Sequence, residues 1–270
     1  MKIAIIPNLK RDDGGKLAMD IAEKIANLGG TPVLSNELES NFQCADYPEL
    51  YNTVDAVIAV GGDGTILHIA KHAAEFGKPV LGVNAGRLGF MAGLEPDELD
   101  GLEALIKGDY ELEKRMMLKT DIEDGRSFYC LNDAVITKGV LSRVIDISVT
   151  VGKSELAYRA DGLILATPTG STAYSVSAGG PVIDPAVSCI LVTPICPHSL
   201  LSRSIILERD MKIEVCANGP DNTDVFLTAD GEEAVCVSGK KVIVTAAERY
   251  VDLIKIKKDS FYSVLKGKLL

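Results

Sequence analysis

The sequence lacks several patterns by which large classes of protein are recognised. No apolar run reaches the roughly 18 residues that a membrane-spanning helix needs. The six cysteines are scattered without a C-x-x-C pair, which argues against a zinc site or a disulfide framework. The first seven residues are too short for a signal peptide and predict a strand instead. These absences predict a globular protein of the reducing cytoplasm.

Positive charge is also scarce. Lys and Arg total 28 against 38 Asp and Glu, so the formal net charge is −10. A general nucleic-acid or membrane-surface binder needs a basic face, so neither kind of partner is expected. If the ligands are polyphosphates, they must be attracted by local N–H groups, a helix terminus, a few cations or bound Mg²⁺. This requirement favours a metal-bound nucleotide.

Two nucleotide-binding fingerprints are missing. Gly152-Lys153-Ser154 lacks the upstream glycine of a Walker A loop, because Ile147 stands in its place. No G-x-G-x-x-G follows a predicted strand, so the usual Rossmann fingerprint is absent as well. A nucleotide would have to be held in another way.

The first hundred residues alternate strand and helix patterns. Apolar runs at residues 3–6, 32–34, 56–60 and 79–83 predict buried strands. Helical stripes lie between the first pair of strands (Leu17, Ile21, Ile25, Leu28) and between the last pair (Ile66, Ile69, Ala70, Ala73). Alternating strands and helices predict a Rossmann-like parallel sheet covered on both faces.

After about residue 105 apolar residues alternate with polar ones, as at residues 145–151, 211–215 and 225–229. Such short strands predict an antiparallel β-sandwich, interrupted by a loop and a short helix over residues 161–181. We therefore expect an α/β plus all-β protein. Its α/β domain covers residues 1–105 and its β-sandwich domain residues 106–254. A terminal helix at about residues 259–268 lies in the tail 255–270, which we expect to dock back on the first domain.

The most informative segment is Gly-Gly-Asp-Gly-Thr at residues 61–65, between the apolar run 57–60 and the helical pattern 66–70. Glycines at a strand-to-helix turn let backbone N–H groups approach an anion, and the helix N-terminus adds partial positive charge. Asp63 repels a phosphate, so it is better suited to accept a proton, hold a hydroxyl or help to hold a metal ion. A phosphate cradle with a carboxylate predicts phosphoryl transfer to a hydroxyl.

Four further segments carry polar groups where chemistry could occur. They are residues 84–90 (Asn-Ala-Gly-Arg-Leu-Gly-Phe), the pair Asn132-Asp133 inside an apolar stretch, the hydroxyl-rich residues 159–181, and the turn Asp230-Gly231-Glu232. Asn132-Asp133 could also be a satisfied buried pair, Tyr174 a core residue, and Asp230 a common hairpin turn. His68 and His72 have zinc-like spacing, but H-E-x-x-H is absent and a surface position is favoured.

Together these motifs resemble those of the NAD kinase family. That family is marked by GGDGT after a strand, N-x-G-x-L-G-F one strand later, an Asn-Glu or Asn-Asp pair, and a long segment containing T-P-T-G-S-T-A-Y. All four are present in order, at residues 61–65, 84–90, 132–133 and 161–181. GGDGT alone is shared with lipid kinases, whereas the long hydroxyl-rich segment is specific. Asp133 stands where glutamate is common, so its reach is shorter.

The resemblance implies an ATP-dependent kinase that phosphorylates the 2′-hydroxyl of the adenosine ribose of NAD, giving NADP. It implies a divalent cation, usually Mg²⁺, and a cytoplasmic homodimer or homotetramer. Asp63 would be the catalytic aspartate; no metal ligand is assigned. The candidate substrate- and nucleotide-binding residues are Gly62, Gly64, Thr65, Asn84, Phe90, Asn132, Asp133, Arg159, Asp161, Thr169, Thr172, Ala173, Tyr174, Ser177 and Asp230. Charge alone suggests Arg87, Lys138 and Arg159 for the triphosphate.

Two alternative functions are left open. A lipid kinase for diacylglycerol or sphingoid bases carries the same glycine turn, but it would want an apolar acyl cavity or a basic membrane-facing patch. A non-catalytic dinucleotide sensor would keep the pocket without the chemistry, and an intact Asp63 argues against it.

Overall fold

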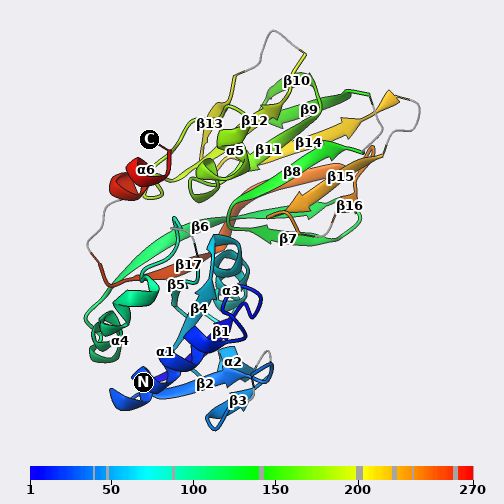
Figure 1. The fold of residues 1–270 in the computed structure, drawn as a ribbon. Coiled ribbons are helices and arrows are strands. Elements are labelled where there is room, and N and C mark those ends of the chain that lie inside the picture. The colour runs from blue at the N-terminus through cyan, green and yellow to red at the C-terminus, as the bar shows by residue number, and fades with distance from the viewer. Residues whose placement is uncertain are drawn as a thin grey trace. The chain divides into compact units, whose positions relative to one another are not determined.

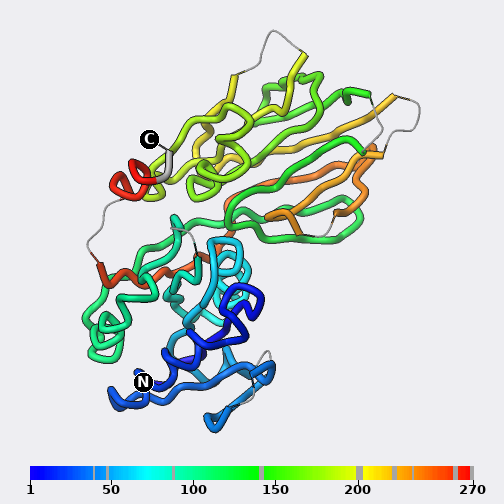
Figure 2. The backbone as a smooth tube through the Cα atoms, viewed as in Figure 1, coloured from blue at the N-terminus to red at the C-terminus, as the bar shows by residue number. Residues whose placement is uncertain are grey.

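A computed structural model gives the fold of the chain (Figure 1). It describes residues 1–38, 40–46, 49–86, 89–139, 143–198, 203–220, 224–232, 234–257 and 261–269, so Arg87 lies outside the described residues. The chain forms two compact units: Met1–Lys114 with Val251–Leu270, and Arg115–Tyr250. Figure 2 traces the backbone of both units. Each unit has its own hydrophobic core.

The first unit is built on a parallel sheet. Its strands run in the order β5 (Val80–Asn84), β4 (Ala56–Gly61), β1 (Lys2–Pro7), β2 (Thr31–Ser35) and β3 (Gln43–Ala45). The helices of this unit are α1 (Lys16–Asn27), α2 (Glu49–Asn52), α3 (Asp63–Glu75), the 3-10 turn η1 (Pro96–Gly101), α4 (Leu102–Lys107) and α6 (Phe261–Leu269). The strands follow the apolar runs of the sequence closely.

The helices cover both faces of this sheet. Ile21 and Ile25 of α1 and Leu105 of α4 join one core with alternate residues of the strands, among them Ile5 and Ile58. On the other face α3 packs against β4 and β5. All six residues of β4 are buried because both faces are covered. This arrangement brings the carboxyl end of β4 to the N-terminus of α3.

The second unit is an antiparallel sandwich. One sheet has the order β13 (Ile205–Glu208), β12 (Cys189–Ile195), β11 (Gly162–Ala166), β8 (Asp133–Lys138), β15 (Val225–Ala229) and β16 (Val235–Cys236). The other contains β10 (Ser154–Ala160), β9 (Ile145–Val151), β14 (Ile213–Asn218), β17 (Lys241–Lys255), β6 (Glu111–Ile122) and β7 (Ser127–Cys130). Side chains from both sheets form one core, as the alternation of apolar residues requires.

The predicted fold class, a parallel α/β domain and a β-sandwich domain, is confirmed. One detail is wrong: residues 161–181 are not only a loop and a short helix, because they begin with the strand β11. This strand is central and buried on both faces, so its residues are continuously apolar and show no alternation. The terminal helix is present as α6, while Asp259, where it was predicted to begin, lies outside the described residues. Among the described residues, no helix is both long and apolar enough to cross a membrane.

Candidate active site

The glycine turn lies where β4 ends and α3 begins. Gly62 precedes the helix in an extended conformation (φ −92°, ψ 179°), and Asp63 is the first helical residue. A side chain at Gly61 would collide with Thr65, because its Cβ would lie 2.6 Å from the Thr65 Cβ. The turn therefore closes tightly over the first helical turn, and the N-terminus of α3 supplies partial positive charge there.

The loop after β5 holds the Asp63 carboxylate. The backbone N–H of Phe90 donates to Asp63 Oδ2 at 2.9 Å and that of Met91 to Oδ1 at 3.1 Å. Gly89 is required beside them, since a Cβ there would lie 2.2 Å from Asp63 Oδ1. The N-x-G-x-L-G-F motif thus orients the carboxylate of the GGDGT motif. This relation between the two motifs was not predicted from the sequence.

Asn84 and Phe90 serve the same loop. Asn84 is fully buried, and its Nδ2 donates to Glu95 Oε2 at 2.8 Å and to the Gly86 carbonyl at 3.3 Å. The ring of Phe90 lies 6.1 Å from that of Phe261 of α6. Both candidates are therefore placed to shape the loop that holds Asp63.

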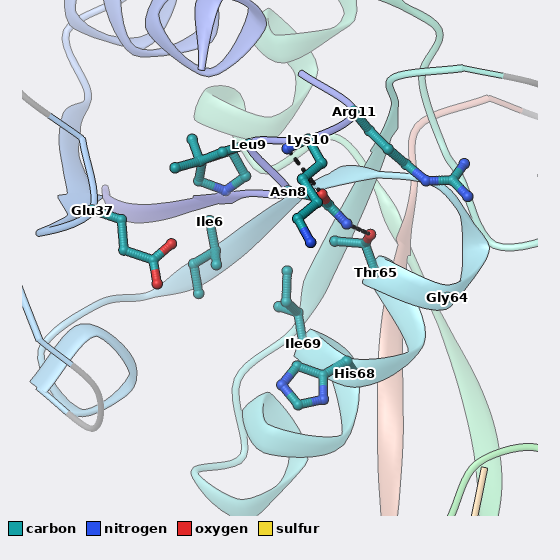
Figure 3. Close-up of a pocket in the computed structure, with 11 residues that line it drawn as sticks. Ile6, Asn8, Leu9, Lys10, Arg11, Glu37, Gly64, Thr65, His68 and Ile69 are labelled. Carbon is teal, nitrogen blue, oxygen red and sulfur yellow. Dashed lines mark hydrogen bonds between the residues drawn. The ribbon is translucent and has the colours of Figure 1, made fainter. Parts of the chain in front are cut away.

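A cavity of about 570 Å³ opens beside the glycine turn (Figure 3). Its lining consists of Ile6, Pro7, Asn8, Leu9, Lys10, Arg11, Glu37, Gly64, Thr65, His68 and Ile69. Asn8 Nδ2 donates to Thr65 Oγ1 at 3.0 Å, which ties the loop after β1 to the first turn of α3. The volume is within the range of small-molecule sites.

Two cations of this cavity were missed by the sequence analysis. Lys10 and Arg11 are exposed on the loop after β1. The Arg11 guanidinium lies over the glycine turn, because a Cβ on Gly62 would stand 2.8 Å from Arg11 Nη1. The available clue was their position at the carboxyl end of a parallel strand, where ligands of such sheets bind.

In the second unit, residues 131–133 form a corner that links β7 of one sheet to β8 of the other. The Asp230 carboxylate accepts three successive backbone N–H groups of this corner: Leu131 at 2.8 Å, Asn132 at 2.7 Å and Asp133 at 3.0 Å. The Asp230 N–H donates in turn to the Asp133 carbonyl at 2.9 Å. The structure therefore brings three predicted site residues together, with Asp230 as their support.

Residues of the hydroxyl-rich segment also form hydrogen bonds with the 131–133 corner. The Thr167 N–H donates to the Asn132 carbonyl at 2.8 Å, and its hydroxyl donates to the Leu131 carbonyl at 2.5 Å. Gly170 lies so close that a Cβ would stand 2.1 Å from the Asn132 oxygen. Thr169 is also buried, and its Oγ1 accepts from Arg115 at 3.1 Å. The first half of T-P-T-G-S-T-A-Y thus forms hydrogen bonds and close contacts within the second unit.

Buried hydroxyls anchor the rest of this segment. The Ser171 hydroxyl accepts the Ile183 N–H at 2.9 Å, and the Ser175 hydroxyl shares a hydrogen bond of 2.9 Å with Thr193. Thr172, Ala173, Tyr174 and Ser177 remain at least partly exposed. The resemblance implies that these four line the adenosine pocket together with Asp161.

Asp133 has an unusual environment for a carboxyl group. It is only 5% exposed, and burial, followed by the charge of Asp230, raises its pKa from 3.8 to about 7. The group therefore changes charge near neutral pH. Such a shift in a polar cluster is typical of functional sites.

Arg159 and Asp161 stand apart from the corner. Asp161 precedes β11, and its carboxylate forms an ion pair of 2.7 Å with Lys138. Along β11 the pairing runs from Gly162 opposite Thr137 to Ala166 opposite Asp133, so about 17 Å of strand separates Asp161 from the corner. Arg159 is exposed on β10 and lies 4.0 Å from Asp146.

The described residues contain no group of three His, Cys, Asp or Glu side chains that could hold a metal ion by itself. The rings of His68 and His72 lie 4.7 Å apart in an edge-to-face arrangement. At the glycine turn, the Asp63 carboxylate at the head of α3 would be a protein ligand for a metal ion. That donor set suits Mg²⁺, which is commonly bound through one or two carboxylates together with substrate phosphates.

Comparisons with known proteins agree with this geometry. Residues 34–110 match the model of the ATP-NAD kinase N-terminal domain, and residues 131–256 match that of the ATP-NAD kinase C-terminal domain. The chain is 39% identical to the NAD kinase of Caldanaerobacter subterraneus subsp. tengcongensis, over 99% of this chain and 98% of that protein.

Two solved structures are also similar. An NAD kinase from Archaeoglobus fulgidus in complex with ATP has a TM-score of 0.79 and 28% identity, covering all of this chain and 98% of that one. Yeast NADH kinase complexed with NADH has a TM-score of 0.86 over all of this chain and 87% of that one. Its identity is 23%, so it supports the fold alone.

The fold, the glycine turn and the carboxylate held above it define a kinase, a phosphotransferase that acts on an alcohol group. Within that class the assignment is specific, because the two domain models together span most of the chain and the relatives match it over nearly its full length. The chain belongs to the NAD kinase family.

Proposed function

We propose that this chain transfers the γ-phosphoryl group of ATP to the 2′-hydroxyl of the adenosine ribose of NAD, giving NADP. The observation that carries the proposal is the Asp63 carboxylate, held by two backbone N–H groups at the head of α3 in a member of the NAD kinase family. A ribose hydroxyl is a weak nucleophile. A positioned carboxylate that orients it and accepts its proton contributes ~10²–10⁴-fold to the rate.

The donor nucleotide occupies the cavity beside the glycine turn. Lys10 and Arg11 provide the positive charge for the triphosphate, which the net charge of −10 otherwise repels. Gly62 and Gly64 keep the turn free of side chains, and Thr65 is bound to Asn8 on the same wall. Phosphoryl transfer depends mainly on such alignment and charge neutralisation.

The acceptor dinucleotide is bound by the second unit. Asn132 and Asp133 contact its hydroxyl groups, and the accessible members of the hydroxyl-rich segment line its adenosine portion: Thr172, Ala173, Tyr174 and Ser177. The buried residues Thr169 and Asp230 support these contacts from behind. Asn84 and Phe90 support Asp63 in the same way. Asp161 and Arg159 are assigned to the outer part of the dinucleotide.

We assign Mg²⁺ as the metal cofactor, which Asp63 would hold together with the phosphates of ATP. When bound, it neutralises charge on the transferring phosphoryl group. We also propose a cytoplasmic homodimer or homotetramer with no nucleic-acid or membrane partner. The acidic composition supports this proposal, as do the six cysteines, which form no disulfide in the described part of the chain.

The test is a coupled assay for NADP with purified protein, ATP, MgCl₂ and NAD. Formation of NADP that stops when ATP or the metal is withheld is the expected result. Parallel reactions with diacylglycerol or sphingosine in place of NAD test the lipid-kinase hypothesis, which the relatives do not support. Binding of NAD without any NADP formation would instead indicate the non-catalytic sensor.

A further inference from the structure

The support of the 131–133 corner is itself a charged group. Asp230 follows β15 with a left-handed backbone conformation (φ 53°), and Gly231 continues it (φ 72°). Aspartate tolerates this conformation better than most residues because its short side chain can bond to nearby backbone. Here the turn directs the carboxylate onto three successive N–H groups of a distant segment. The position is thus shaped to present a carboxylate to the corner.

The same carboxylate acts on Asp133. Asp133 is the first residue of β8, between β11 and β15, and its own N–H is one of the three donors to Asp230. After burial, the charge of Asp230 is what raises its pKa. The position of the corner and the charge of Asp133 are therefore set by one residue.

Apart from Asp230, the described groups around Asp133 named here are neutral, bonded to other residues or exposed. On the β11 side, the neighbours Ala166 and Thr167 are neutral. Arg115 of β6 is bonded to the Thr169 hydroxyl, and Lys138, at the far end of β8, is paired with Asp161. Glu232, in the same turn as Asp230, is exposed. Among these charged groups, Asp230 is the one whose field acts on Asp133.

We propose that Asp230 is a positioning residue for the dinucleotide site and forms a coupled pair with the buried carboxyl of Asp133, so that affinity for NAD depends on whether Asp133 is ionised. This inference rests on the proposed function, because it takes NAD as the ligand of the corner. The ionised form of Asp133 binds, since a carboxylate accepts charge-assisted hydrogen bonds from ribose hydroxyls. Protonation removes that acceptor and weakens binding.

The experiment measures the dissociation constant of NAD by calorimetry without ATP, from pH 5.5 to pH 8.5. For the wild type we expect affinity to be constant above about pH 7 and to fall by up to tenfold for each pH unit below it. Asp133→Asn should bind NAD more weakly at pH 8, with no pH dependence in this range. The exposed Asp210→Asn, whose side chain is 78% exposed, serves as the control and should keep the wild-type curve.

Asp230 is tested by two variants that separate its charge from its shape. Asp230→Asn removes the charge, so the acidic limb of the curve, which is the pH range in which affinity for NAD falls, should move to lower pH. The loss of positioning should also lower affinity at pH 8 by about tenfold. Asp230→Glu keeps the charge, so the limb should stay near its wild-type position even where affinity falls. A purely structural Asp230 would lower affinity in both variants without moving the limb.

The outcomes distinguish this inference from the proposed function. Failure to bind NAD at any pH would overturn both. The coupled pair alone would be overturned if the wild type binds NAD with an affinity that does not depend on pH. It would also be overturned if the acidic limb of Asp230→Asn lies at the same pH as that of the wild type. Should Asp230→Asn not fold, the comparison of wild type with the near-isosteric Asp133→Asn decides the question, since a pH limb shared by both excludes Asp133 as its source.

Discussion

In both units of this protein a candidate site contains a carboxylate that accepts several backbone N–H groups, but the two carboxylates, Asp63 and Asp230, have different surroundings. Asp63 accepts two N–H bonds and stands at the N-terminus of α3, beside a cavity with two exposed cations. Asp230 accepts three N–H bonds and stands next to a second, buried carboxyl. The same local arrangement, a carboxylate that accepts backbone N–H groups, thus stands near positive charge in one unit and near a second carboxyl group in the other.

The comparison separates two roles that the sequence does not separate. A carboxylate at a helix N-terminus beside cations is placed to meet a hydroxyl and a metal-bound phosphate. A carboxylate that satisfies three N–H groups of an inter-sheet corner orients its neighbours instead. Loss of the first should therefore affect turnover, and loss of the second should affect binding and its pH dependence.

The largest expected effect is that of Asp63→Asn. We expect turnover to fall ~10²–10⁴-fold, because the proton acceptor is lost, while the dissociation constant of NAD changes little. Steady-state kinetics and calorimetry measure the two quantities, with the exposed Asp109→Asn as a control of similar chemistry. Near-normal turnover in Asp63→Asn would remove this residue from the chemistry and erase the contrast with Asp230.

The next effect concerns stability and Asp133. Its pKa rises from 3.8 to about 7 on folding, so folding retains a proton that the unfolded chain loses. The free energy of unfolding should therefore fall as the pH rises from about 4 to about 7, with a total loss of about 4 kcal/mol. Asp133→Asn should remove this loss and be more stable than the wild type at pH 8.

Urea unfolding at pH 4.5, 6 and 8 measures this difference. The gain in stability from Asp133→Asn should be smallest at pH 4.5 and largest at pH 8. An equal effect at all three values would mean that Asp133 does not change its charge on folding in this range. In that case a raised pKa of Asp133 would no longer distinguish the surroundings of Asp230 from those of Asp63.

Most of the fold could be predicted from the sequence, because the strands of the first unit are short apolar runs bounded by helical stripes. The strand β11 was missed for a physical reason. It lies between β8 and β12 with both faces covered, so its residues do not alternate between apolar and polar, and it begins directly after the charged Asp161. Periodicity cannot identify a strand whose two faces are equally apolar.

The sequence predicted individual residues of the candidate site but not the contacts between them. The motifs identified Asp63, Asn132 and Asp133, but not that Gly89 and Phe90 orient Asp63 or that Asp230 and Thr167 fix the corner. These relations join residues that are 26 to 99 positions apart. Local propensity carries no information about such distances, so only the fold reveals them.

A smaller effect is expected for Arg11→Ala. Its guanidinium lies over Gly62 in the donor cavity, so its loss should raise the KM for ATP by about 10–100-fold, the value of one charge-assisted hydrogen bond. The KM for NAD should change little. Lys107→Ala, which removes an exposed cation of α4 in the same unit, is the control. An equal rise in both KM values would place Arg11 outside the donor site.

The smallest effect tests a third carboxylate held by backbone N–H groups. Asp12 is 3% exposed and accepts the N–H of Leu17 at 2.7 Å and of Ala18 at 3.0 Å, at the start of α1. Like Asp63 it has two N–H partners near a helix N-terminus, but it is buried as Asp133 is. If exposure decides the role, Asp12→Ala should act as the loss of a helix cap, costing about 1 kcal/mol of stability.

The KM for ATP should rise less in Asp12→Ala than in Arg11→Ala, because Asp12 only steadies the loop that carries Arg11. Urea unfolding and steady-state kinetics measure both, and a loss of turnover comparable to that of Asp63→Asn would show that burial does not separate the two roles.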